Sequence, residues 1–263
     1  MHDKTTLSQT RTDPFDLSRA HALQATLGQT PTLQTGDPMP PFYHQIYFWD
    51  PQPPENLGRD GHPATGPFIP DLGLPRRMWA AGKLVFHGPL LAGMQAERTS
   101  TIDSVTRKQG RSGPLGFVTI RHDIKQHGTL ALTEWQELVY RADDAPCGPP
   151  PTARTDETHA QTANFDSTLL FRYSALTFNG HRIHYDETYA RQTEGYDGLV
   201  VHGPLLAHLL MGLAEGQLGN LTAFSYRATA PLMHHETATL CWNGGQAWVR
   251  GPDGRQCMMA EAR

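Results

Sequence analysis

The chain has 263 residues, of which 38% are hydrophobic, so it is long enough for one large domain or two smaller ones with a real core. Its formal net charge of -4 lacks the positive surplus on which nucleic-acid binding depends, which excludes DNA and RNA as expected partners. The 25 glycines and 21 prolines predict many turns and favour β structure over long helices.

The apolar stretches of the chain indicate neither secretion nor a membrane. Residues 1–13 lack the apolar run of a signal peptide, and the longest apolar stretch, residues 199–214, is too short to span a bilayer and contains two histidines. The three cysteines are odd in number and form no C-x-x-C pair, so no disulfide framework or zinc knuckle is expected. We therefore expect a cytoplasmic protein that does not bind membranes.

The N-terminal half, residues 1–140, contains mostly strand-like alternation. Residues 83–105 alternate around a Pro-Leu pair, and residues 113–126 and 128–142 alternate on either side of His127-Gly128, which predicts a β-hairpin. Residues 15–28 (FDLSRAHALQATLG) are amphipathic at best. This half therefore lacks the signal of a long buried helix.

Residues 141–164 hold four prolines and many polar side chains without a hydrophobic period, which predicts a linker. The C-terminal half, residues 165–263, again contains alternation broken by Pro-Leu, from Ala223 to Trp242. Superposing Pro89 on Pro231 aligns the two halves and predicts a diverged repeat of strands with a kinked beginning. Residues 237–251 end the half with a second hairpin at Asn243-Gly244-Gly245.

One helix is predicted clearly, from Gly203 to Leu218 (GPLLAHLLMGLAEGQL), between a first-turn proline and the stop signal Gly219. Because it is apolar on nearly every face, it must be enclosed. A short antiparallel sheet curled around one buried helix is the hot-dog fold. The sequence thus predicts an α+β double hot-dog whose N-terminal half is degenerate.

The most informative stretch is FRYSALTFNGHRIHYD, Phe171 to Asp186, followed by EGYDGLVVHGPLLAHLL from Glu194. It resembles the MaoC-like hydratase/dehydratase superfamily, whose motif reads approximately Y-x-x-S-G-D-x-N-P-[LIV]-H-x-[DE] before an HG-headed central helix. LPRRMWAAG from Leu74 and the HRIHYD string resemble the double hot-dog branch of this superfamily. That branch contains 3-hydroxyacyl-thioester dehydratases and itaconyl-CoA or mesaconyl-CoA hydratases.

The resemblance implies a catalytic acid–base at His184, with Asn179 at the place of the family's catalytic aspartate. An imidazole can remove a proton from the attacking water and, once charged, return one to the α-carbon. An amide cannot take a proton, but Asn179 could hold the attacking water. With Gly180, however, Asn179 also forms a common turn pair, and the sequence leaves both roles open.

The remaining candidate residues are inferred from two negative charges, one that develops on the thioester oxygen and one on a substrate carboxylate. The backbone amide of Gly203, at the start of the predicted helix, is suited to the negative charge that develops on the thioester oxygen, although glycine before proline also serves a turn. A substrate carboxylate would need a cation, for which Arg182, Arg76 and Arg77 are candidates, and His202 is a further substrate-binding candidate.

The expected activity is hydration or dehydration of a short enoyl-CoA thioester, of the C5 dicarboxylate type that itaconyl-CoA and mesaconyl-CoA represent. No cofactor and no metal are expected, because the pairs His181/His184 and His234/His235 lack the carboxylate or cysteine company of a metal site. A homodimer is among the expected assemblies. The alternatives are a fatty-acid-type dehydratase acting on CoA or acyl-carrier-protein thioesters, a thioesterase, and a non-catalytic acyl-binding subunit.

Overall fold

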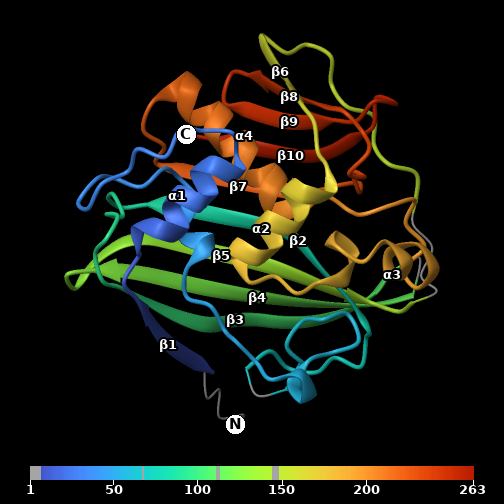
Figure 1. The fold of residues 1–263 in the computed structure, drawn as a ribbon. Helices are drawn as coiled ribbons and strands as arrows, with labels where there is room; N and C mark the ends of the chain where they lie inside the picture. Colours follow the sequence, from blue (N-terminus) through green and yellow to red (C-terminus); the bar gives the residue numbers. More distant parts are fainter. Residues whose placement is uncertain (1–6, 67, 111–112, 144–147) are drawn as a thin grey trace.

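Residues 7–66, 68–110, 113–143 and 148–263 are described by a computed structural model, in which all strands join one antiparallel sheet of ten strands (Figure 1). The order across the sheet is β1-β3-β4-β5-β2-β7-β10-β9-β8-β6. The strands of the first half are β1 (Ser8–Asp13), β2 (Arg76–Phe86), β3 (Ala96–Gly110), β4 (Gly113–Gln126) and β5 (Thr129–Arg141). Those of the second half are β6 (His159–Ala163), β7 (Ala223–Ala228), β8 (Ala238–Asn243), β9 (Gln246–Arg250) and β10 (Gln256–Ala262).

This strand order is symmetric about the central β2–β7 pair, in which Ala81 faces Arg227 and Val85 faces Ala223. Outward from the centre, β5, β4, β3 and β1 correspond to β10, β9, β8 and β6. A duplicated chain gives such an order, as the Pro-Leu repeat predicted. The prediction of a strand with a kinked beginning is wrong, because Pro89 and Pro231 lie in the connections that follow β2 and β7.

Both predicted hairpins are present. β4 and β5 are joined by His127 and Gly128, which take φ values of 50° and 76°, and β8 and β9 are joined by Gly244 and Gly245, at 55° and 88°. Two successive residues with positive φ give the turn whose twist matches that of the flanking strands. The turn residues in the sequence were therefore sufficient to predict both hairpins.

Helix α4 (Gly203–Leu218) packs on the sheet, and the helices α1 (Leu17–Thr26) and α2 (Ser167–Thr177) lie in front of the sheet beside it (Figure 1). Leu205, Leu210 and Met211 of α4 are fully buried, and they share one hydrophobic core with α1, α2 and both halves of the sheet. In α4, only Gly212 and the last turn are exposed. The prediction of an enclosed central helix is confirmed. The shorter helices are η1 (Tyr43–Ile46), η2 (Pro54–Asn56), η3 (Arg182–His184) and α3 (Glu187–Gln192).

No described helix of the N-terminal half is comparable to α4. An aromatic segment, residues 42–48, packs against the sheet in this half. Its apolar side chains are buried in the same core as Leu84 of β2, Ile124 of β4 and Leu132 of β5. Within the described residues, the N-terminal half therefore lacks a helix as long as α4, as predicted.

The aromatic segment also covers a buried polar group. Glu134 on β5 is 1% exposed, and its carboxylate lies 3.1 Å from Nε2 of His44 and accepts a hydrogen bond of 2.8 Å from Nε2 of Gln45. Burial alone would raise the pKa of Glu134, but the neighbouring His44 lowers it below the ordinary value. The charged form is thus held in the core by its partners.

We expect Glu134→Ala to lower the free energy of unfolding by about 3 kcal/mol, because it leaves the buried side chain of His44 and the half-buried side chain of Gln45 without their acceptor. Urea denaturation measures this loss, and Glu137→Ala on the same strand is the control, since the Glu137 side chain is 44% exposed and should cost under about 1 kcal/mol. Because the folded-state pKa of Glu134 is lowered, its contribution is present above the unfolded pKa and is lost as the pH falls through the folded one. Equal losses in the two variants would contradict this role of Glu134.

The predicted linker needs correction. β6 (His159–Ala163) lies within residues 141–164 and pairs with β8, although no strand was expected there. Its side chains are almost all exposed, so backbone pairing at the sheet edge forms this strand without a hydrophobic period. The residue limits of the two halves stay a prediction. Cys241 and Cys257 are buried free thiols, and Cys147 lies outside the described residues. Among the described helices, none is long and apolar enough to cross a membrane.

Candidate active site

The segment that carries the motif starts where α2 ends. Phe178 takes a left-handed φ of 51° as the C-cap of α2, and the amide of Asn179 then donates to the carbonyl of Ser174. The side-chain oxygen of Asn179 accepts a hydrogen bond of 3.0 Å from the amide of His181. This Asx turn leads directly into the short helix η3, which contains His184.

His184 is held with one ring nitrogen occupied. It is 6% exposed, and its Nδ1 lies 2.7 Å from the carbonyl oxygen of Val200. Because a carbonyl only accepts hydrogen bonds, Nδ1 must carry the proton of the neutral ring, which leaves the lone pair on Nε2. The ring also stacks on His202 with a centroid distance of 3.7 Å. His184 therefore has a fixed orientation and one nitrogen that can accept a proton.

The histidines around this position are kept neutral. Burial lowers the pKa of His184 to about 3, and His181 contributes to the same shift. Burial also lowers the pKa of His181 to about 4, with a further contribution from Arg77. At neutral pH both rings are thus in the basic form, but the charged form of His184 is disfavoured. The sequence alone suggested the ordinary pKa of imidazole, which this burial changes.

The N-terminus of α4 lies beside His184. His202, the N-cap residue of α4, is completely buried, and its Nε2 lies 2.8 Å from Oγ of Ser174 on α2. Gly203 follows as the first residue of the helix. A Cβ at Gly203 would meet only the carbonyl oxygen of Trp79, at an ordinary 3.6 Å, so packing does not require glycine here. A glycine at this point leaves the helix N-terminus accessible.

The structure separates the three candidate arginines. Arg76 donates to the Glu194 carboxylate at 2.7 Å and to the Glu194 carbonyl at 2.6 Å, and both side chains are nearly buried. Arg182 pairs with Asp186 at 2.7 Å, and its side chain is 41% exposed. Arg77 is nearly buried, and its carboxylate neighbour, Asp60, is 4.0 Å away. Arg77 therefore has the longest ion pair of the three, whereas Arg76 and Arg182 form short ion pairs with Glu194 and Asp186.

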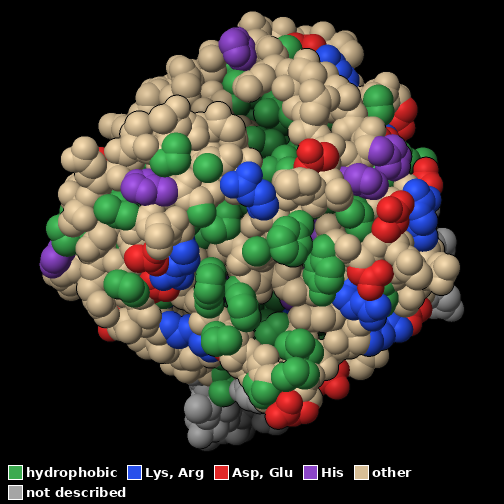
Figure 2. Space-filling view, in the orientation of Figure 1, with side chains coloured by type: hydrophobic (Ala, Val, Ile, Leu, Met, Phe, Trp, Pro, Cys, Tyr) green, Lys and Arg blue, Asp and Glu red, His purple; other side chains and the backbone are tan. Residues whose placement is uncertain are grey.

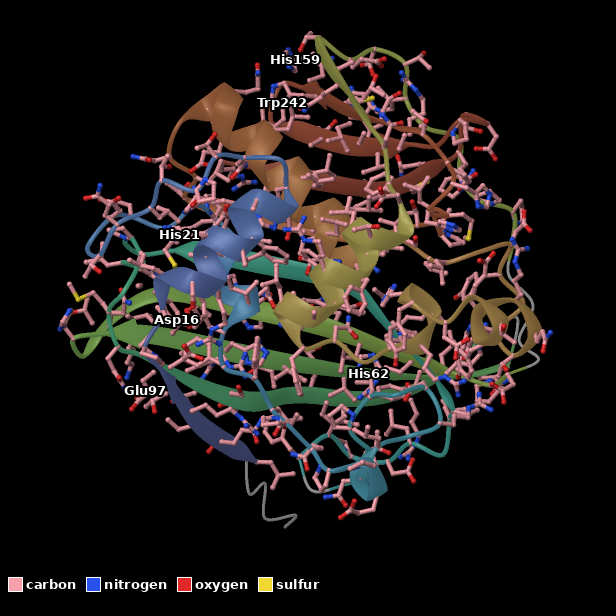
Figure 3. All side chains as sticks on the ribbon, in the orientation of Figure 1. Asp16, His21, His62, Glu97, His159 and Trp242 are labelled. Atoms are coloured by element: carbon pink, nitrogen blue, oxygen red, sulfur yellow. The ribbon has the colours of Figure 1, made fainter. Side chains whose placement is uncertain are left out.

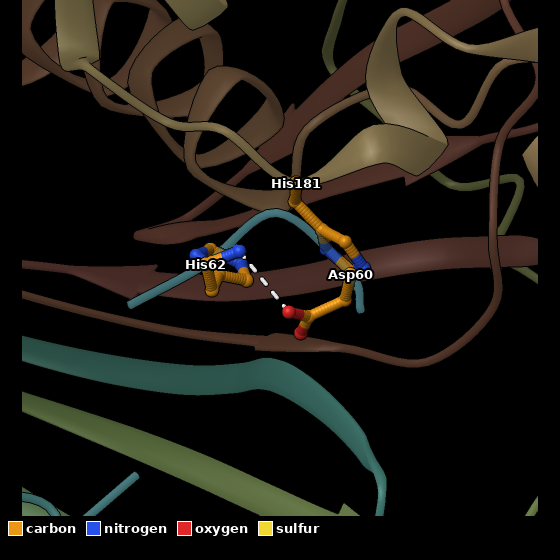
Figure 4. Close-up of side chains that lie close together, drawn as sticks. All are labelled: Asp60, His62 and His181. Atoms are coloured by element: carbon orange, nitrogen blue, oxygen red, sulfur yellow. Dashed lines mark hydrogen bonds between the residues drawn. The ribbon is translucent and has the colours of Figure 1, made fainter. Parts of the chain in front are cut away.

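Two residues of the N-terminal half, Asp60 and His62, lie at this site although the sequence did not predict them. A ligand atom of each lies within 4.8 Å of the other and of a ring nitrogen of His181 (Figure 4). Figure 3 labels His62 on its loop in front of the sheet, well apart from Asp16 and His21 at α1. The expectation that His181 has no carboxylate neighbour is wrong, because the carboxylate comes from a segment 121 positions earlier in the chain. The short D-G-H run, residues 60–62, was its one sequence signal.

Two glycines hold this loop against the motif. A Cβ on Gly61 would overlap the carbonyl oxygen of Gly180. A Cβ on Gly180 would lie 2.5 Å from the carbonyl oxygen of Gly61. The amide of Arg182 donates to the carbonyl of Asp60 at 2.9 Å. Backbone thus meets backbone, which only glycine permits at this separation. The two halves of the chain therefore meet in one tight contact beside His181 and His184.

Apolar side chains are exposed next to this contact. Phe171, Phe178 and Tyr185 are about half exposed or more, and Phe178 stacks on Trp49 with ring centroids 5.2 Å apart. Figure 2 shows hydrophobic side chains gathered over the middle of this face. A surface hollow of about 670 Å³ is lined by Trp49 and by residues of β1 and α1, and a second of about 290 Å³ by residues of β2 and β7. Neither hollow includes His184.

Comparison with known proteins identifies relatives of the whole chain. The family model described as hydroxyacyl-thioester dehydratase type 2 matches residues 42–234. A curated protein of Chloroflexus aurantiacus named mesaconyl-C(4)-CoA hydratase is 44% identical over 257 residues, which cover 94% of this chain and 92% of the relative.

Solved structures give the fold. The crystal structure of HtdX from Mycobacterium tuberculosis matches with a TM-score of 0.69 at 18% identity, covering 97% of this chain and 99% of that one. A second protein of the same organism, described as having a double hot-dog fold, matches with a TM-score of 0.60 at 13% identity over 99% of this chain and 96% of that one. The predicted double hot-dog fold is confirmed.

Proposed function

Because the chain belongs to the hydroxyacyl-thioester dehydratase type 2 family, we propose that it is a hydro-lyase that adds or removes water at the double bond of an enoyl-CoA thioester. The observation that carries the proposal is the arrangement of His184. Its Nδ1 is occupied by the carbonyl of Val200, so its Nε2 is the nitrogen that exchanges a proton, beside the N-terminus of α4.

In the direction of hydration, Nε2 of His184 takes a proton from water while the water oxygen bonds to the β-carbon. The electrons of the double bond move towards the thioester, whose oxygen gains negative charge. The amide of Gly203 and the dipole of α4 stabilise that charge. The imidazolium then returns its proton to the α-carbon, so that one water has been added and the thioester is intact.

Asn179 is proposed to hold the segment and not to transfer a proton. Its side-chain oxygen already accepts the hydrogen bond of the His181 amide, which supports the turn role that the sequence left open. The amide group of the same side chain remains able to donate to the attacking water. His202 is proposed to support the ring of His184 by packing and not to contact the substrate. Its complete burial and its stacking on His184 support this role.

A hydration assay tests the proposal directly. The enzyme should remove the absorbance of a conjugated enoyl-CoA while the amount of free thiol stays constant. Release of free CoA would instead identify a thioesterase. If neither the enoyl absorbance nor the thiol changes with any short enoyl-CoA, the non-catalytic alternative is favoured. A fatty-acid-type dehydratase remains the second candidate, supported by the description of the family model.

For the substrate, we propose a C5 dicarboxylate thioester of the mesaconyl type, on the strength of the named relative. The free carboxylate of such a substrate requires a cation close to the reacting carbons. Sequence order favoured Arg182, but its ion pair with Asp186 and its exposure support Arg77 instead. Arg77 is nearly buried and contributes to the lowered pKa of His181, one ring away from His184.

Accordingly, the wild type should have a higher kcat/KM for mesaconyl- or itaconyl-type CoA esters than for crotonyl-CoA, and Arg77→Met should reduce this preference roughly 10²-fold or more. A buried carboxylate without its cation costs about 3–5 kcal/mol, which sets that size. The measurement is kcat/KM for both substrates in both proteins, with Arg172→Met, an exposed arginine of α2, as the control. An unchanged preference in Arg77→Met would reject this arginine, and a wild type that prefers crotonyl-CoA would reject the dicarboxylate.

A further inference from the structure

The proposed chemistry leaves one difficulty. His184 must become positively charged after it takes the proton of water, yet it is buried, and its neighbours His181 and His202 are also neutral imidazoles with lowered pKa values. A nearby negative charge would stabilise the imidazolium. In the motif that this sequence resembles, an aspartate stands five positions before the histidine, but here that position is Asn179, whose oxygen is used in the turn.

A carboxylate is nevertheless present on the other side of His181. The ring of His181 lies edge-on to His184, with centroids 5.4 Å apart, and 4.8 Å from the ring of His62. The Asp60 carboxylate lies within 4.8 Å of the nearest ring nitrogens of His181 and His62 (Figure 4). Among the described residues around it, Arg77 of β2 is the facing cation, at 4.0 Å, and Arg76 of the same strand is paired with Glu194.

The position of Asp60 is fixed by contacts that also fix His184. One carboxylate oxygen of Asp60 accepts a hydrogen bond of 3.0 Å from the amide of His62, and the carbonyl of Asp60 accepts one from the amide of Arg182, two residues before His184. The backbone contact between Gly61 and Gly180 closes the same junction. A shift of the loop would therefore move Asp60 and the motif together.

We propose that Asp60 of the N-terminal half supplies the negative charge that the C-terminal motif lacks at Asn179, acting through His181 on His184. This inference rests on the proposed hydro-lyase function. Asp60 is a positioning residue that stays a carboxylate throughout, so the proton taken from water by His184 still returns to the α-carbon. Its charge stabilises the imidazolium that exists between these two steps, and the hydrogen bond from the His62 amide holds the carboxylate in place.

The test is Asp60→Asn, which keeps the oxygen that accepts the His62 amide and removes only the charge. We expect kcat to fall roughly 10²-fold with little change in KM, because only the charged intermediate loses stabilisation. The acid limb of the kcat/KM profile should move to lower pH, since loss of a negative charge lowers the pKa of a nearby imidazole. Asp60→Glu should retain much of the activity, and Asp71→Asn, at an exposed aspartate of the same half, should be neutral.

A second variant distinguishes charge from structure. In the Asp60→Asn background, Asn179→Asp returns a carboxylate to the place of the family aspartate and should recover at least tenfold in kcat. Normal turnover in Asp60→Asn, an unshifted acid limb, or no recovery in the double variant would each overturn the proposal. So would activity that is lost on chelation and restored by Zn²⁺, since Asp60, His62 and His181 would then be metal ligands. If the wild type hydrates no enoyl thioester, the proposed function itself is rejected, which the wild-type assay reports separately.

Discussion

Replacing His184 by alanine should lower kcat for hydration by roughly 10²–10⁴-fold or more, because the proton of the attacking water then has no acceptor. The ring nitrogen involved is Nε2, since Nδ1 is bonded to the carbonyl of Val200. Steady-state kinetics of the folded variant measures the loss. His159→Ala is the control, because His159 is exposed on the edge strand β6 (Figure 3). A folded His184→Ala protein with normal turnover would remove His184 from the mechanism.

The same residue sets an expected pH dependence. Because the pKa of His184 is lowered to about 3, its neutral, basic form is present throughout the neutral and weakly acidic range. Activity that depends on this base should therefore stay level as the pH falls towards 5 and decline only as the lowered pKa is approached. An acid limb near the ordinary pKa of histidine would instead indicate that the site opens to solvent when substrate binds.

The second large effect is expected from Gly61→Ala. The new Cβ would overlap the carbonyl oxygen of Gly180, and Gly61 has a φ of +86°, which alanine rarely adopts. The loop must move away from the motif, and a displacement of about 1 Å at a catalytic centre can cost around 10²-fold in rate. We expect kcat to fall by about that factor, whereas the loss in the free energy of unfolding should stay near ~1–3 kcal/mol.

Gly88→Ala is the matched control, because a Cβ there meets nothing within 4 Å and Gly88 does not have a positive φ. Enoyl-CoA kinetics and urea unfolding of both variants separate activity from stability. If Gly61→Ala has normal kinetics, the junction between the two halves does not control the geometry of His184. If both variants lose activity equally, the effect is unrelated to the contact with Gly180.

The elements that the sequence predicted are those whose signal is local. Alternation identified β4 and β5, turn-forming residues identified the hairpins, and the apolar faces of α4 identified the enclosed helix. β6 was missed because an exposed edge strand is formed by pairing with β8, which leaves no pattern in its own side chains. The symmetric strand order was anticipated only through the Pro-Leu repeat.

In the candidate site, too, the residues with a local sequence signal were predicted and those placed by tertiary contacts were not. His184 and the N-terminus of α4 lie close together in sequence within one motif, so a single stretch predicted their proximity. Asp60 and His62 reach the same place through a tertiary contact, which no periodicity in residues 58–63 reveals. The roles suggested for Arg76 and Arg182 depended on partners, Glu194 and Asp186, that only the folded chain assigns. Burial, which determines the pKa of His184, is likewise a property of the fold.

The aromatic segment at residues 42–48 has a consequence for stoichiometry. A duplicated chain with a symmetric strand order begins with two equivalent places for an acyl group, one on each half of the sheet. In the N-terminal half, Phe42, Tyr43 and Ile46 are almost completely buried in the core that lies against the sheet. We therefore expect each polypeptide to accommodate one acyl group at a time, in the half that carries His184.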